Sequence, residues 1–332
     1  ITRGALYTII GGILFSWLMN FSMIGVEAIL TLVGLIIFMV SVDLAYSKAN
    51  GDKKQKIAFS LIYIAVIIVS LSLVVIVGFV TIRGASQISW EFLSQPPSDI
   101  GRAGGILPAI VGSLQIMGGA IAIAVPLGIA AGIYLAEYAK EGKLVRTIRM
   151  GIDNLNGTPS IVFGLFGMVV FVNLFGWQRS LLAGMCTISL MILPTIIRTT
   201  EQAIKQVSDD LREGSLGLGA TKWETIRKVV LPSSGSGIVT GIVLAMGRAI
   251  GECAAIMFTA AVFFRSNVSP DVMEPVMALP YHIYIMATVV PGGRDVAYGS
   301  AFVLIVMVLF FYALAMFIRK RIDKKLLKTF QY

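Results

Sequence analysis

The most regular feature of the chain is a series of apolar runs separated by short charged segments. The runs cover residues 4–20, 23–46, 57–83, 106–138, 158–176, 179–200, 234–264 and 296–319. Because about 20 apolar residues cross the hydrocarbon core of a bilayer as a helix, each run predicts one membrane helix. Their repetition predicts an all-α, polytopic membrane protein.

The spacing of the runs predicts three parts. Residues 1–50 are expected to form a transmembrane helical hairpin, residues 57–320 a domain of six membrane helices, and residues 321–332 a basic tail. Arg3 before the first run is also typical of a signal peptide, but no small-residue cleavage site follows. We therefore expect residues 1–20 to be a retained helix.

Composition agrees with a membrane protein and excludes several site types. Charged residues make up 14% of the chain, against about 25% in soluble domains, and the mean hydropathy is +0.86. The net charge of +9 is distributed between the apolar runs, which argues against nucleic acid as a partner. Cys186 and Cys253 have no C-x-x-C spacing, and His282 is the only histidine. We expect no disulfide framework, metal site or cofactor in this chain.

Lysine and arginine gather in alternate connections between the runs. Basic segments lie at 48–56, 140–149, 201–231 and 319–328, whereas 84–105 and 265–295 contain few basic residues. The positive-inside rule then places the basic segments and both termini in the cytoplasm, and the other two segments outside.

Residues 200–232 form an amphipathic segment that predicts two short helices joined at Gly219. The sequence at 213–232 is EGSLGLGATKWETIRKVVLP. It resembles the EAA loop of ABC-importer permeases, in which a Glu, two small residues, a Gly six positions after the Glu and a final Leu-Pro recur. The matching positions are Glu213, Gly214, Ser215, Gly219, Leu231 and Pro232.

This resemblance implies that residues 201–232 are a coupling loop that docks in a groove of a separate ATPase subunit. Gly214 and Gly217 stand where alanine is usual. Each glycine costs a helix about 1 kcal/mol relative to alanine, so docking is expected to supply more of the helix's order. An amphipathic helix lying on lipid headgroups is the alternative, but it does not require this spacing.

Two charged pairs lie in apolar runs or directly at the end of one. Arg198 and Glu201 are three residues apart and Arg248 and Glu252 are four apart, so each pair shares a helix face. Charges at membrane depth cost about 2.5–3.5 kcal/mol on insertion scales, which makes both pairs functional candidates. A guanidinium fork suits an oxyanion, and Glu252 is expected to accept a hydrogen bond from a protonated one. Ion pairs that only join helices are the alternative.

Further strings extend the resemblance over most of residues 57–319. They are GTPSIVFGLFG at 157–167, LPTIIRTTE at 193–201, RAIGE at 248–252 and MALPYHIY at 277–284. They resemble the PstA and PstC family of phosphate-uptake permeases, and the last string is more similar to PstA. The family implies a MetI-like, type I ABC-importer core of six transmembrane helices, to which the hairpin at 1–50 is an addition.

The family resemblance also implies roles for single residues. The charged positions associated with phosphate passage are Arg198, Glu201, Arg248 and Glu252. Gly157, Thr158 and Ser160 are expected to open a helix whose N-terminus suits an anion, with an ordinary N-terminal cap as the alternative. Cys253 and Ala255 depart from the Thr and Pro often found there.

The implied partners are a second related (PstC-like) permease, two PstB-like ATPase subunits and a PstS-like extracytoplasmic phosphate-binding protein, at a prokaryotic plasma membrane. The chain has no G-x-x-x-x-G-K-[ST] phosphate loop, so ATP hydrolysis is expected in the partner, and this chain is not expected to be an enzyme. The alternatives are a permease for another oxyanion such as sulfate or molybdate, an ion-coupled secondary transporter, and an assembly or sensory protein.

Overall fold

The structure, a computed structural model, describes residues 51–268 and 271–329. The hairpin predicted over residues 1–50 lies outside the described residues. Contacts divide the chain into two compact units between Ile76 and Val77, and the site described below lies in the second. The described chain is helical apart from one isolated bridge and an antiparallel pair, β1 (Pro97–Ser98) with β2 (Ala103–Gly104). The predicted all-α class is confirmed.

Among the residues that the structure describes, five helices are long and apolar enough to cross a membrane. Their spans are Ile62–Ala85, Leu107–Tyr138, Leu181–Lys205, Lys222–Ile250 and Arg294–Arg321. They belong to α3 (Gly51–Ala85), α5 (Leu107–Ile133) with the π-helical turn η2 (Tyr134–Tyr138), α8 (Leu181–Lys205), α10 (Lys222–Thr225) with η4 (Ile226–Val230) and α11 (Leu231–Ile250), and α14 (Arg294–Thr329). Four agree closely with predicted runs.

The predicted helix at 158–176 is one arm of a bent pair. α6 (Lys143–Asn156) meets α7 (Ser160–Gly167), which continues through η3 (Met168–Leu174), at an angle of 102°. The bend falls at Pro159, because proline has no N–H for the helical ladder and disfavours helical backbone at the residue before it. With this pair counted as one crossing, the predicted core of six membrane helices is confirmed.

The predicted run at 234–264 is not one helix. α11 ends at Ile250, and the chain turns through 251–253 before the short helix α12 (Ala254–Thr259). Ala255 and Ile256 are at most 3% exposed. Their apolar character reflects packing inside the protein, so the expectation of a continuous membrane helix was wrong.

Short elements fill the two connections that were predicted to be external. Between α3 and α5 lie α4 (Trp90–Ser94), η1 (Asp99–Gly101) and the β pair. α4 begins at Ser89, whose hydroxyl accepts a hydrogen bond from the N–H of Phe92. Between α12 and α14 lies α13 (Leu279–Thr288), which packs on α14 and α5.

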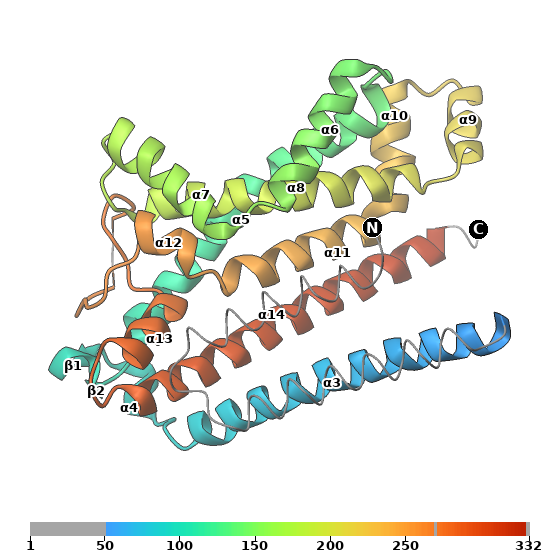
Figure 1. Cartoon of the computed structure of the whole chain (residues 1–332). Coiled ribbons are helices and arrows are strands. Elements are labelled where there is room, and N and C mark those ends of the chain that lie inside the picture. Colours follow the sequence, from blue (N-terminus) through green and yellow to red (C-terminus); the bar gives the residue numbers. More distant parts are fainter. Residues whose placement is uncertain (1–50, 269–270, 330–332) are drawn as a thin grey trace, which may run out of the picture. The chain divides into compact units, whose positions relative to one another are not determined.

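α8 is the centre of the core, with α5 and α11 packed beside it (Figure 1). Ile188, Met191 and Ile192 of α8 are fully buried at 0% exposure. A Cβ atom at Gly128 of α5 or Gly241 of α11 would lie 2.6 Å or 1.9 Å from an atom of α8. These glycines therefore allow the close approach of helices that is common in membrane proteins.

Candidate functional site

Two short helices form the segment between α8 and α11, as predicted. α9 (Asp209–Gly217) is followed by α10, and the side chains of Ser208 and Thr221 cap the two helices. Gly219 lies between them with φ of +87°, a left-handed conformation that glycine adopts without strain. The predicted joint at Gly219 is confirmed.

The residues of α9 that resemble the EAA loop are mostly at the surface. Glu213 is exposed, and Gly214 has no atom within 4 Å of an added Cβ. The hydroxyl of Ser215 lies 2.9 Å from that of Thr225 and connects α9 to α10.

Leu231 and Pro232 mark the start of α11. Leu231 packs against a small core that includes Ile204 and Val230. Pro232 lies in the first turn, directly after the π-helical turn η4. A π-helical turn re-routes the backbone hydrogen bonds, so the helix from Lys222 to Ile250 remains one element despite the proline.

The surface of this segment carries apolar side chains. Leu218 is 92% exposed, Trp223 54% and Leu216 48%. Exposed apolar side chains so close together along an otherwise polar segment are typical of a surface that contacts another chain or lipid headgroups.

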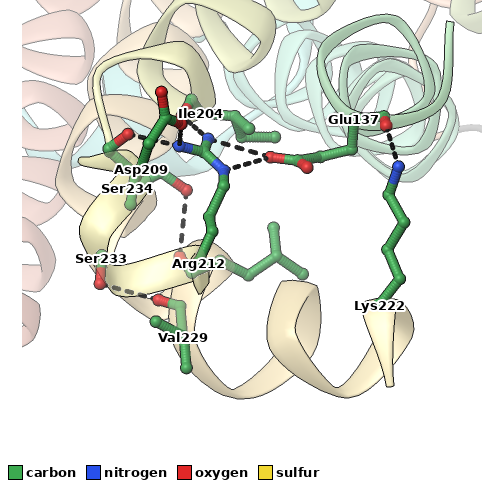
Figure 2. Close-up of polar contacts among 10 residues, drawn as sticks. Glu137, Ile204, Asp209, Arg212, Lys222, Val229, Ser233 and Ser234 are labelled. Carbon is green, nitrogen blue, oxygen red and sulfur yellow. Dashed lines mark hydrogen bonds and ion pairs between the residues drawn. The ribbon is translucent and has the colours of Figure 1, made fainter. Parts of the chain in front are cut away.

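A charged cluster that sequence reasoning missed connects this segment to α5 and α8 (Figure 2). Arg212 of α9 donates to the Glu137 carboxylate from Nε at 3.1 Å and from Nη2 at 3.0 Å. Lys222 of α10 donates to the backbone carbonyl of Glu137. The Arg212 network comprises Glu137, Ile204, Val207, Asp209, Arg212 and Lys222. The one sequence signal for it is an acidic residue, Glu137, at the end of an apolar run.

Glu201 is 1% exposed and has three basic partners. Its carboxylate lies 2.7 Å from Nε of Arg149, 2.8 Å from Nζ of Lys205 and 3.2 Å from Nη1 of Arg198. Arg149 comes from α6, 52 residues away along the chain, and sequence reasoning assigned it no role at this site. A buried carboxylate is tolerated when several cations surround it in this way.

Two further carboxylates extend this cluster. Arg149 also lies 2.7 Å from Glu141, and its guanidinium holds the pKa of the Glu141 carboxyl below the usual range through a hydrogen bond. Arg198 lies 3.2 Å from Asp153 of α6, and its side chain is 33% exposed. Arg198 and Glu201 thus take part in ion pairs that join α6 to α8.

Arg248 and Glu252 form a looser pair. Arg248 lies in the last turn of α11, and Glu252 follows the helix end. Nε of Arg248 is 3.8 Å from Oε1 of Glu252, which is an ion-pair distance but too long for a hydrogen bond. The side chains are 30% and 14% exposed. Arg248 and Glu252 are therefore in contact at a spacing of four residues, although α11 ends before Glu252.

The residues expected to open a helix at 157–160 are divided between two helices. Gly157 ends α6, and the hydroxyl of Thr158 donates to the carbonyl of Asn154 at 2.9 Å. Only Ser160 opens α7, which has no side-chain cap. Thr158 therefore completes α6 instead of capping α7.

The bend between α6 and α7 lies beside the helix that carries Arg198. The hydroxyl of Thr195 donates to the side chain of Asn156 at 2.8 Å. A cavity of about 320 Å³ between α6, α7 and α8 is lined by Thr158 and uncharged neighbours. In the described part of the chain, no ion pair or hydrogen bond joins Arg198 or Glu201 to Arg248 or Glu252.

Comparison with known proteins identifies relatives over most of the chain. Residues 124–328 match the family described as binding-protein-dependent transport system inner membrane component. The probable ABC transporter permease protein YqgI of Bacillus subtilis is 36% identical over 290 residues, which cover 83% of this chain and 99% of that protein. The phosphate transport system permease protein PstA of Yersinia pestis is 40% identical over 210 residues, covering 62% and 68% of the two chains.

Solved structures share the fold. A chain in the crystal structure of a bacterial alginate ABC transporter, in complex with an alginate pentasaccharide-bound periplasmic protein, superposes with a TM-score of 0.59 at 15% identity. The match covers 81% of the present chain and 98% of the other. At this identity the likeness shows the fold alone.

Proposed function

Because this chain belongs to the family of binding-protein-dependent transport system inner membrane components, we propose that it forms part of the membrane pathway of an ATP-driven importer for inorganic phosphate. The family, the YqgI relative and the six crossings establish an ABC-importer permease. This membership favours an ATP-driven importer over the ion-coupled secondary transporter. The observation that supports phosphate is the presence of two partly exposed arginines, each beside a carboxylate, on the membrane helices α8 and α11. The likeness to proteins named PstA agrees with it.

Arg248 makes the first contact with the ion in this proposal. Its guanidinium is only loosely held, at 3.8 Å from Glu252, so its donors are available for two parallel hydrogen bonds to a phosphate. Glu252 accepts a hydrogen bond from the protonated oxygen that monohydrogen or dihydrogen phosphate still carries. A fully deprotonated oxyanion has no such proton, so Glu252 favours phosphate.

Arg198 acts nearer the expected cytoplasmic end of the pathway. It lies two helical turns before the end of α8 and is held by Asp153 and Glu201. These carboxylates orient its guanidinium while leaving one third of the side chain exposed. The bend at 157–160 lies beside this helix and forms part of the pathway wall in this proposal.

The segment with α9 and α10 docks on a separate ATPase subunit in this proposal. The exposed Glu213, Leu218 and Trp223 provide the polar and apolar contacts for that surface. A second PstC-like permease completes the pathway, a second ATPase subunit pairs with the first, and an extracytoplasmic binding protein delivers phosphate. The basic connections and both termini then lie in the cytoplasm.

The test is ATP-dependent phosphate uptake into vesicles that contain this chain with its partner permease, ATPase and binding protein. We expect Arg248→Ala to lower uptake by about tenfold or more, because an ionic hydrogen bond to the ion is lost. The matched control is Arg146→Ala, which removes an exposed arginine of α6 and should leave uptake unchanged. Co-purification of the ATPase subunit verifies that both variants assemble.

Two results would contradict the proposal in different ways. Normal uptake by Arg248→Ala would remove this residue from the pathway. Uptake of sulfate or molybdate in place of phosphate by the wild-type complex would overturn the cargo and leave the permease class intact.

A further inference from the structure

α9 is held to the rest of the protein by polar contacts and not by a buried apolar face. None of its nine residues is buried. Its connections include the bond between Ser215 and Thr225 and the contacts of Arg212. Besides its backbone connections at 206–208 and 218–221, α9 is therefore joined to the membrane helices mainly through these polar contacts.

Arg212 connects α9 to the end of α8. Its guanidinium donates to the backbone carbonyls of Ile204 at 2.8 Å and Val207 at 2.5 Å. The last carbonyls of a helix lack partners within the helix, and a cation there also complements the helix dipole. The side chain of Arg212 thus caps the C-terminal end of α8, although Arg212 itself belongs to α9.

Glu137 is held from both halves of the segment (Figure 2). Arg212 of α9 contacts its carboxylate, and Lys222 of α10 contacts its carbonyl at the C-terminal end of η2. Lys222 also lies over the ring of Tyr138, with Nζ 4.7 Å from the ring centroid. The π-helical turn η2 that ends α5 is therefore attached to α9 and to α10 through two neighbouring residues, Glu137 and Tyr138.

Burial distinguishes this network from an ordinary surface ion pair. The side chains of Arg212 and Glu137 are 18% and 10% exposed, whereas those of Lys228 and Glu224 in the same segment are 70% and 44% exposed. Exposed pairs are screened by water and are easily exchanged for solvent contacts. The partly buried pair resists such exchange and maintains a fixed geometry.

We propose that Arg212, Glu137 and Lys222 are positioning residues that move the ends of α5 and α8 together with the segment that contacts the ATPase. This inference rests on the proposed docking of that segment, but not on the identity of the cargo. Without the network, the backbone connection at 206–208 would be the main link between α9 and α8, and a smaller part of any movement of α9 would reach the ends of α8 and α5.

The experiment measures the number of ions transported for each ATP hydrolysed by the complete complex in vesicles. We expect Glu137→Ala to lower this ratio by about tenfold, the factor associated with one hydrogen bond between charged groups. Basal ATP hydrolysis and co-purification of the ATPase should remain near wild type. Arg212→Lys keeps the charge but offers three donors from a single atom in place of the guanidinium fork that contacts four partners, so it should give an intermediate ratio.

Lys228→Ala is the matched control, because it breaks the exposed pair of the same segment and should leave the ratio unchanged. A wild-type ratio in Glu137→Ala would overturn the inference. So would a loss of assembly that fully accounts for the lost transport, since that would make the network merely structural. The ratio is measured with whichever oxyanion the wild-type complex carries, so a wrong cargo assignment is detected separately.

Discussion

At the scale of single residues, burial decides which charges have fixed partners. Glu201 is 1% exposed and is surrounded by Arg149, Arg198 and Lys205. Removing one partner of a buried pair costs about 3–5 kcal/mol, whereas an exposed pair contributes about 0–1 kcal/mol. Glu201 is therefore a principal polar contact between α6 and α8, in addition to any part that Arg198 has in transport.

His282 is a buried titratable residue outside the membrane spans. It is 2% exposed, and neither ring nitrogen has a hydrogen-bond partner among the described residues. Burial lowers its pKa from 6.5 to about 4. The folded protein therefore keeps this imidazole neutral at a pH where an unfolded chain would protonate it.

The low pKa predicts that acid destabilises the fold through His282. The unfolded chain binds a proton as the pH falls below 6.5, and the folded chain does not until the pH approaches about 4. Stability is thus lost across this window, by about 2 kcal/mol between pH 6.5 and about 5. Thermal unfolding in detergent at about pH 7 and about pH 5 should show a drop in Tm that His282→Phe reduces. An equal drop in both proteins would contradict the assignment.

Sequence reasoning succeeded for residues whose partners are close along the chain. Arg198 with Glu201, and Arg248 with Glu252, are in contact as their spacing indicates. By contrast, Glu201 lies 52 residues from Arg149, and Arg212 lies 75 residues from Glu137. Only the packing of α6 on α8, and of α9 beside the end of α5, brings these groups together, and no local pattern encodes it.

At the scale of elements, the apolar pattern indicates where helices lie but not what surrounds them. The runs at 106–138 and 179–200 agree with α5, η2 and α8 within a few residues. The run at 234–264 combines a membrane helix with a buried return segment, and both are apolar for different reasons. Hydropathy alone does not separate contact with lipid from contact with protein.

The helix α9 provides a test of glycine in the coupling segment. Gly214 lies inside α9 with open space around an added Cβ, so Gly214→Ala should stabilise the helix by about 1 kcal/mol. Slower amide hydrogen exchange across α9 would show this. Gly219→Ala is the contrasting variant, because φ of +87° strains an alanine and should speed exchange. Faster exchange in Gly214→Ala would contradict the argument.

At the scale of the whole molecule, the spans differ in how much protein covers them. In α8, 61% of the most apolar window is buried, whereas in α14 the share is 6%. α8 therefore belongs to the interior, and the apolar surface of α14 is available for lipid or another chain. If the bent pair of α6 and α7 is one crossing, the described residues make six crossings, and the start of α3 and the end of α14 lie on the same side of the membrane.

The orientation of these crossings can be tested by cysteine labelling. In a background with Cys186→Ala and Cys253→Ala, Trp90→Cys lies between α3 and α5, where the native side chain is 82% exposed. We expect a membrane-impermeant maleimide to label it in intact cells. Lys228→Cys, at a site whose side chain is 70% exposed, should react only after permeabilisation. The reverse pattern would place α9 and α10 outside the cell, away from any ATPase subunit.

The unbroken helix from Lys222 to Ile250 limits how proteins of this kind can vary in length during evolution. One inserted residue within it would rotate Arg248 by about 100° relative to α10 and shift it by about 1.5 Å. Lys222 is fixed to the end of α5 at one end, so a residue inserted into the regular α-helical part, α11, would displace the guanidinium at the other. Insertions and deletions are therefore expected in connections such as 175–180, while this helix diverges by substitution alone.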